Sequence, residues 1–235
     1  MKASAVSHLT THRLSVYLRC LNHLEEAGVK TVSSRELADQ FHLNSAQIRK
    51  DLANFGEFGT RGVGYDVPAL KLDLIRILGL NKDYNIIIVG AGNLGAALAA
   101  YRGFNVREFR IAALFDIDAD RVKALAAAGF KSYSMSDLKK VVRKEKIDIA
   151  VLAVPAASGQ VVLGQVVEAG VRAILNFVPV TLRVPPGVEL VTVDLKIQME
   201  GLAYHLTHCG PRDARADKPA RASAGKSAGA SRAGR

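Results

Sequence analysis

Apolar residues near the start of the chain recur every three or four positions, a spacing typical of amphipathic helices. The pattern predicts a helix over residues 7–27, a short helix over 34–41 and a third helix after Asn44. Ser33 and Glu36 have the spacing of a capping box at the second helix, and Asn44 can cap the third. These elements predict a small helical domain.

The second and third helices are separated by a three-residue turn, as in a helix-turn-helix. In the third helix an apolar stripe leaves amide and cationic side chains on the other faces. After Gly56, apolar residues alternate around a glycine-rich tip, which predicts a β-hairpin wing with Arg61 at its tip. The residues expected to contact DNA are Ser45, Gln47, Arg49, Lys50, Arg61 and Gly62. A protein-interaction domain with a plain surface hairpin remains the alternative. Pro68 then opens a helix that leads to the next domain.

The second part of the chain begins with a continuous apolar strand, residues 85–89, of the kind buried in a parallel sheet. A GxGxxG turn and a helical segment follow at once. In this arrangement glycines allow the tight turn, and the helix N-terminus binds a pyrophosphate. The turn residues expected to bind the cofactor are Gly90, Ala91, Gly92, Asn93, Leu94 and Gly95.

An acidic residue follows the next predicted strand, 110–115. Asp116 lies 21 residues beyond Gly95, where a carboxylate would accept hydrogen bonds from a ribose diol. Asp118 and Asp120 follow it closely in the sequence. Because three carboxylates would repel a 2′-phosphate, NADH and NAD⁺ are favoured over NADPH. Arg121 is the one nearby residue that argues the other way, because its charge would attract a phosphate. The alternative is that Asp116 caps the next helix.

Further strands are predicted over 148–154, 173–176 and 188–193, with a last helix over 196–208. Val154 and Pro155 fall at the carboxyl end of a strand, where ligands bind in open α/β folds. The predicted fold class is α/β. A winged helix-turn-helix domain with a linker helix (1–80) precedes a Rossmann-like dinucleotide-binding domain (81–195), a C-terminal helix (196–209) and a basic tail (210–235).

Composition adds two expectations. Half of the net charge of +10 lies in residues 210–235, which are rich in Ala, Gly, Ser, Pro and Arg and are expected to be disordered. With no long apolar run, no signal-peptide pattern and two isolated cysteines, Cys20 and Cys209, a cytoplasmic protein without membrane contact is expected. His8 with His12, and His205 with His208 and Cys209, have spacings that could hold a metal, but no metal site is expected.

With only one nucleotide fold in these residues and no Tyr-x-x-x-Lys or His-Asp pair at a strand end, no catalytic residue is expected and the chain is interpreted as a regulator, not an enzyme. The first alternative is a small NAD-dependent oxidoreductase whose helices serve dimerisation. The second is a DNA-binding protein gated by coenzyme A or another adenine nucleotide.

The chain also resembles a known family, the redox-sensing transcriptional repressor family Rex. The resemblance runs from Val6 to about His208, and the segments that carry it are residues 45–52, 55–65, 89–95, 115–118 and 175–179. It implies a homodimer that binds palindromic operator DNA and releases it when NADH replaces NAD⁺. It also implies that Arg49 and Lys50 face the major groove and that Arg61 serves the wing.

The resemblance further implies that the helix over 196–208 is exchanged between subunits. Arg19 and Asp194 match positions that pair in one state and separate in the other, and Tyr101 matches an aromatic residue near the nicotinamide. Leu195 departs from the pattern, because some members carry an aromatic residue there.

Overall fold

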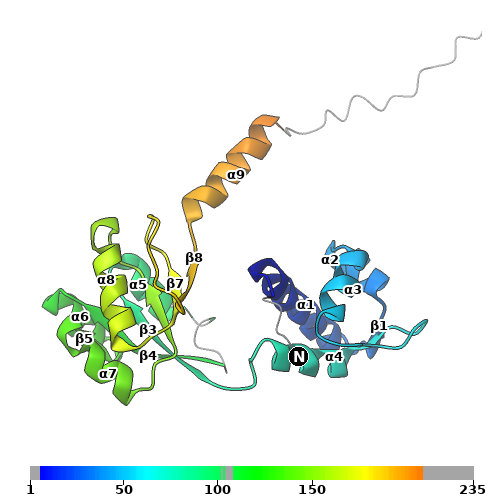
Figure 1. The fold of residues 1–235 in the computed structure, drawn as a ribbon, viewed down its shortest axis with the longest axis horizontal. Helices are drawn as coiled ribbons and strands as arrows, with labels where there is room; N and C mark the ends of the chain where they lie inside the picture. The colour runs from blue at the N-terminus through cyan, green and yellow to red at the C-terminus, as the bar shows by residue number, and fades with distance from the viewer. Residues whose placement is uncertain (1–5, 102, 104–107, 209–235) are drawn as a thin grey trace, which may run out of the picture. The chain divides into compact units, whose positions relative to one another are not determined.

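The computed structural model describes residues 6–101, 103 and 108–208 (Figure 1). The predicted disordered tail and Cys209 lie outside the described residues. The chain divides into two compact units at the junction of Thr192 and Val193, and each unit is described by itself.

The N-terminal part contains the predicted helices. They are α1 (His8–Glu26), α2 (Ser34–Phe41), α3 (Ser45–Ala53) and α4 (Val67–Ile77). The side chain of Asn44 accepts a hydrogen bond from the Gln47 backbone, and Ser33 with Glu36 forms both bonds of a capping box. These caps satisfy backbone N–H groups that would otherwise lack partners, so the predicted starts of α2 and α3 are confirmed. One apolar core joins all four helices.

The wing differs from the predicted hairpin. A single bridge pairs Thr60 with Gly64 around the turn that carries Arg61. The strand that follows, β2 (Tyr65–Asp66), pairs instead with β1 (Thr31–Val32), which lies just before α2. This pairing attaches the base of the wing to the start of the helix-turn-helix.

The C-terminal part of the first unit is built on six parallel strands in the order β5-β4-β3-β6-β7-β8. Their bounds are Tyr84–Val89 (β3), Phe109–Asp116 (β4), Ser132–Ser134 (β5), Ile149–Leu152 (β6), Ala173–Asn176 (β7) and Glu189–Thr192 (β8). Numbered from β3, the order is 3-2-1-4-5-6, which is the Rossmann topology. Strand β5 was absent from the sequence prediction.

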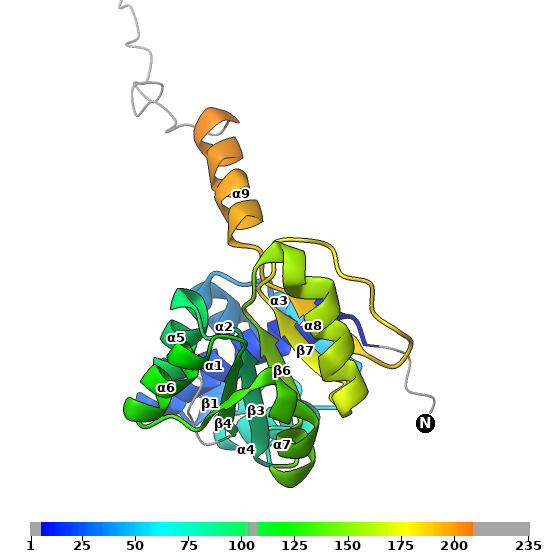
Figure 2. The same cartoon turned by 90° about the vertical axis from the view of Figure 1, so that its left-hand side faces the viewer.

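Helices cover the two faces of this sheet in pairs (Figure 2). On one face lie α5 (Asn93–Ala100) and α6 (Ala119–Ala127), and on the other α7 (Leu138–Lys144) and α8 (Ala156–Ala169), with a short 3₁₀ turn, Met135–Asp137, before α7. An apolar hollow of about 320 Å³ remains on the sheet, lined chiefly by side chains of β6, β7 and β8 such as Val151, Leu175 and Val191.

The second unit contains α9 (Leu195–His208), in which no residue is buried. Asp194 caps it by accepting hydrogen bonds from the backbone of Lys196 and Ile197. Its exposed apolar side chains are Leu195, Ile197, Met199, Leu202, Tyr204 and Leu206. Across the described residues, no helix combines the length and hydrophobicity needed to cross a membrane.

Candidate functional site

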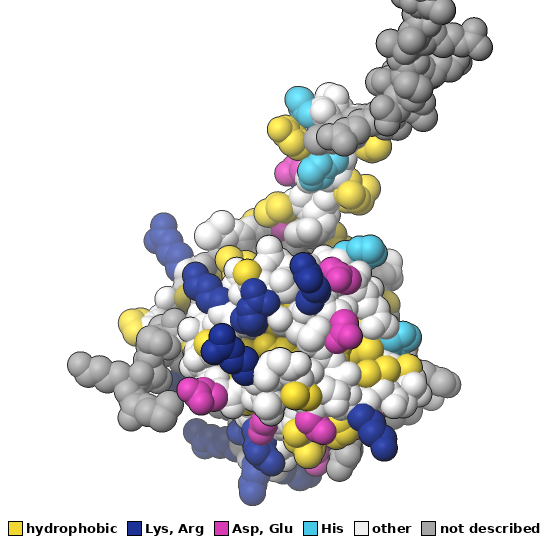
Figure 3. All heavy atoms as spheres, turned by 90° about the vertical axis from the view of Figure 1, so that its right-hand side faces the viewer, with side chains coloured by type: hydrophobic (Ala, Val, Ile, Leu, Met, Phe, Trp, Pro, Cys, Tyr) yellow, Lys and Arg dark blue, Asp and Glu magenta, His cyan; other side chains and the backbone are white. Residues whose placement is uncertain are grey.

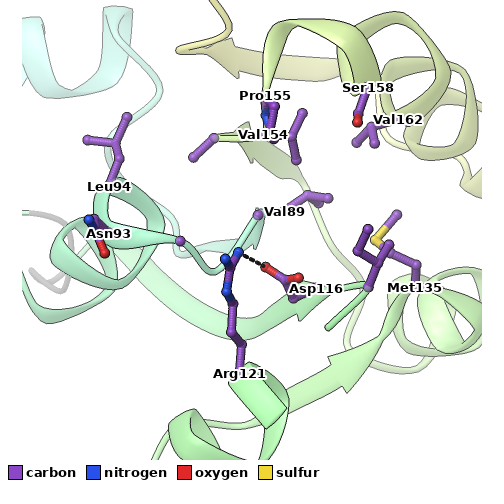
Figure 4. Close-up of a pocket in the computed structure, with 14 residues that line it drawn as sticks. Val89, Asn93, Leu94, Asp116, Arg121, Met135, Val154, Pro155, Ser158 and Val162 are labelled. Carbon is purple, nitrogen blue, oxygen red and sulfur yellow. Dashed lines mark ion pairs between the residues drawn. The ribbon is translucent and has the colours of Figure 1, made fainter. Parts of the chain in front are cut away.

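A pocket opens at the carboxyl end of the sheet, between β3 and β6 (Figure 4). This is the point where the strand order reverses, and Rossmann folds bind ligands there. The cavity has a volume of about 340 Å³, within the usual range for small-molecule sites. Of the predicted cofactor residues, seven line it: Gly90, Gly92, Asn93, Leu94, Asp116, Val154 and Pro155.

The glycine turn has no room for side chains at two positions. Gly90 has a φ of +99°, and a Cβ there would lie 2.5 Å from the Ala153 carbonyl oxygen. A Cβ on Gly95 would lie 1.8 Å from the Gly90 carbonyl oxygen. The turn therefore requires glycine at both positions, and this close packing brings the start of α5 against the end of β3.

Two helix N-termini border the pocket. Gly92 caps α5 and Pro155 caps α8, and neither helix has a side-chain hydrogen bond at its cap or an acidic residue in its first turn. Backbone N–H groups in the first turn of a helix have no partner within the helix and carry partial positive charge. The pocket thus has the chemistry required to hold the phosphates of a dinucleotide.

Asp116 connects this turn to β4. Its side chain is buried, and its two oxygens accept hydrogen bonds from the backbone N–H groups of Ala91 at 2.6 Å and Asp118 at 2.9 Å. The guanidinium of Arg121 points toward the same carboxylate at 3.8 Å (Figure 4). The cap of α6 is Asp118, so the alternative role of Asp116 as helix cap is wrong. A carboxylate offers about four acceptor sites, which leaves capacity for a ribose hydroxyl.

The remaining predicted cofactor residues lie elsewhere. Ala91 and Gly95 belong to the turn but do not line the pocket, and Tyr101, at the end of α5, is 60% exposed and also outside the lining. Met135 and Ser158 line the pocket and were missed by the sequence analysis. Met135 follows β5, so recognising that strand would have been the signal for it.

The predicted DNA-contacting residues lie on α3 and the wing. Arg49, Lys50, Arg61 and Gly62 are exposed, whereas Ser45 and Gln47 are partly buried. A face of the N-terminal domain carries a group of Lys and Arg side chains (Figure 3). Exposed cationic side chains on α3 and the wing suit contact with nucleic-acid phosphates.

A buried carboxylate fixes the position of α3. Asp51 is 1% exposed and accepts hydrogen bonds from Arg13 Nε at 2.6 Å and Nη2 at 2.8 Å, from the Tyr17 hydroxyl at 2.9 Å and from Gln47 Nε2 at 2.8 Å. The hydrogen bonds from Arg13 hold the pKa of Asp51 below its usual value, while burial raises the pKa of Tyr17. A paired and fully hydrogen-bonded carboxylate can be buried at low cost, so this cluster ties α3 to α1.

The implied switch residues lie in separate units, Arg19 exposed on α1 and Asp194 at the start of α9. In the described part of the chain, no group of three or more His, Cys, Asp and Glu side chains is arranged to hold a metal.

Family models match both parts of the chain. The model described as "Putative DNA-binding protein N-terminus" matches residues 5–53, and the model described as "CoA binding domain" matches residues 81–180.

A helix-turn-helix domain joined to a Rossmann domain with a dinucleotide-type pocket defines a nucleotide-responsive transcription regulator. The redox-sensing transcriptional repressor Rex of Carboxydothermus hydrogenoformans is 46% identical over 206 residues, which span 88% of this chain and 99% of the relative. Rex of Streptomyces coelicolor is 44% identical, over 92% of this chain and 83% of the relative. The chain belongs to the Rex family of redox-sensing transcriptional repressors.

Solved structures agree with this assignment. The crystal structure of RSP in complex with β-NAD⁺ and operator DNA matches with a TM-score of 0.81 and 39% identity, over 87% of this chain and 94% of that one. The structure of RSP in complex with β-NADH matches with a TM-score of 0.77 and 38% identity, over 87% and 95%. The predicted fold class is confirmed, and the relatives are repressors, which contradicts the oxidoreductase alternative.

Proposed function

We propose that this protein is a cytoplasmic homodimeric repressor that binds palindromic operator DNA and is released by NADH but not by NAD⁺. One observation carries the proposal. A glycine turn and a buried acidic residue line a pocket on the same chain as a helix-turn-helix, and RSP, 39% identical, has been solved with both operator DNA and NAD⁺.

Different residues of the pocket would bind different parts of the dinucleotide. The turn and the N-termini of α5 and α8 would hold the pyrophosphate, and Asp116 would accept a hydrogen bond from the adenosine ribose. Val154, Pro155 and Ser158 line the side of the pocket formed by the end of β6 and the start of α8. A nicotinamide bound along this side would be the part of the ligand that differs between NADH and NAD⁺.

A ligand changes DNA binding only when its affinity differs between two conformations of the protein. A dimer binds successive major grooves when its recognition helices are about 34 Å apart. If the subunits rotated and changed this spacing, one recognition helix would no longer contact its half of the operator. We propose that NADH favours the rotated state, and that Arg19 and Asp194 pair between subunits in one of the two states.

The proposed dimer uses α9. This helix has apolar side chains of 58% exposure or more on Leu202, Tyr204 and Leu206, and the sheet has an apolar hollow on β6, β7 and β8. Burying both surfaces would release apolar area from water. We propose that α9 of a second copy contributes to covering this region.

Leu202→Asp should therefore weaken the dimer, because a charge would replace an apolar contact. Light scattering after size exclusion should show monomer at concentrations where the wild-type protein is dimeric. Lys196→Asp, an exposed charge change at the start of the same helix, is the control. An unchanged dimer in Leu202→Asp would remove α9 from the proposed interface.

The function is tested by fluorescence anisotropy with an operator duplex selected from random sequence, at fixed salt. NADH should displace the protein at concentrations where NAD⁺ and coenzyme A have little effect. Release by coenzyme A alone would favour the other nucleotide class, and tight binding indifferent to all three would contradict nucleotide gating.

Asp116→Ala should abolish release by NADH while operator binding persists, because the variant loses both the ribose acceptor and a bond that holds the glycine turn. Asp118→Ala is the matched control, since it removes the cap of α6, at a cost of about 1 kcal/mol, and the 3.5 Å pair with Arg121, but leaves the carboxylate that holds the glycine turn. A normal NADH response in Asp116→Ala would argue against the proposed binding mode.

A further inference from the structure

A hollow separates the wing from the helix-turn-helix. Ser34 at the start of α2, Arg49 on α3 and the wing residues Thr60 and Arg61 line it, together with the aromatic rings of Phe58 and Tyr65. Its volume is about 450 Å³. Among the described residues that line it, two are cationic and none is acidic. An anion is therefore the ligand that fits its charge.

Arg49 is turned into this hollow. Its Nη1 atom donates a 2.8 Å hydrogen bond to the Ser34 hydroxyl. It also lies close enough to the Tyr65 phenol to oppose the rise in pKa that burial causes there. A guanidinium has five N–H donors, so the bond to Ser34 leaves others available. Ser34 thus orients a cation that can still bind a second partner.

Lys50 points in another direction. Consecutive residues on a helix are about 100° apart around its axis. Lys50 is exposed and makes no hydrogen bond or ion pair with any described residue. Its ammonium is therefore free for another partner, and side chains of a recognition helix that enters a major groove contact base edges there.

We infer that the hollow between α2, α3 and the wing seats a backbone phosphate of the DNA, bound by Arg49 and Arg61. Arg49 then contributes affinity that is independent of sequence, and Lys50 contributes discrimination between bases. This inference rests on the proposed function, and it separates the roles of Arg49 and Lys50, for which the family resemblance implies only that both face the major groove. Phosphate contacts fix the register of a protein on DNA, and base contacts specify the sequence.

The test compares Arg49→Ala and Lys50→Ala on two labelled duplexes, the selected operator and the same duplex with one base pair changed in each half-site. Anisotropy is measured at several salt concentrations. Arg49→Ala should weaken binding to both duplexes by the same factor, about tenfold, and should reduce the slope of log K against log salt by about 1 for each Arg49–phosphate contact. Lys50→Ala should reduce the ratio of the affinity for the operator to the affinity for the altered duplex.

Arg76→Ala is the matched control. Arg76 is an exposed arginine on α4, paired with Asp73 at 3.0 Å, and its loss should change neither affinity nor slope. Arg49→Lys should recover part of the salt slope, because it keeps the charge without the guanidinium fork. Thermal unfolding of each variant checks the fold.

If Arg49→Ala lowered the ratio of the affinities for the two duplexes, Arg49 would contact a base, and the inference would be overturned. An unchanged salt slope would overturn it as well. Failure of the proposed function looks different, because the wild-type protein would then select no operator or ignore NADH. The salt slope of Arg49→Ala can be measured on any duplex that the wild-type protein binds.

Discussion

Replacing Asp51 with alanine should lower the stability of the N-terminal domain by about 3 kcal/mol, because removing one partner of a buried ion pair leaves the other groups unsatisfied. The variant would leave Arg13, Tyr17 and Gln47 without their shared acceptor. For a small domain this corresponds to a drop in Tm of roughly 12 to 24 °C. Circular dichroism of the full chain, with hydrogen exchange at α1 and α3, measures the effect.

Asp73→Ala provides the comparison. Asp73 forms an exposed pair with Arg76, and such pairs contribute less than about 1 kcal/mol. Equal losses of stability in Asp51→Ala and Asp73→Ala would show that the buried cluster does not stabilise the domain.

The same cluster should make the stability of the N-terminal domain fall at low pH. The pKa of Asp51 is lowered in the folded protein, chiefly by the hydrogen bonds from Arg13, so folding favours its ionised form. Its contribution is fully present above the unfolded value of about 3.9 and is lost as the pH falls through the folded pKa. The stability difference between the wild-type protein and Asp51→Asn should therefore shrink below about pH 4.

Replacing Gly95 with alanine should abolish NADH binding and also destabilise the Rossmann domain. The new Cβ would meet the Gly90 carbonyl oxygen at 1.8 Å, so the turn must move. Gly92→Ala should separate the two effects. The nearest heavy atom to its Cβ is Arg121 Nη1 at 3.8 Å, so the fold tolerates the methyl group. That group would occupy the space through which a pyrophosphate approaches the backbone.

NADH fluorescence titration and thermal unfolding should therefore give different results for these variants. We expect NADH affinity to fall at least about tenfold in both, with Tm lowered only in Gly95→Ala. Gly164→Ala in α8 is the control, since nothing lies within 4 Å of its Cβ and alanine favours a helix by up to about 1 kcal/mol. Normal NADH affinity in Gly92→Ala would place the pyrophosphate elsewhere.

Much of the fold could be predicted because it depends on local chemistry. Ser33, Glu36 and Asn44 bond to residues within three positions, and these bonds determine where α2 and α3 begin. The β3 strand is a continuous apolar run next to a glycine turn, so its burial and the position of the pocket are also local signals.

The features that were missed depend on residues far apart in the sequence. Asp51 is buried only because Arg13 and Tyr17 are brought to it from 38 and 34 residues away. Strand β5, Ser-Tyr-Ser, has no apolar run and exists because it pairs with the edge of β4. The wing strand β2 pairs with the two-residue strand β1, which is too short for a hydrophobic period to indicate.

The apolar hollow on β6, β7 and β8 has a consequence for how the protein behaves in a cell. A surface with almost only hydrocarbon side chains is unfavourable in water, and in the proposed dimer the second copy that would cover it is available only in proportion to its abundance. The folded state is then stabilised by mass action, so Tm should rise with protein concentration. In the proposed dimer, a low concentration of this protein in the cell would leave more of it as monomer, with the hollow uncovered and less protection from proteolysis. The strength of repression would then depend on gene dosage as well as on the redox state.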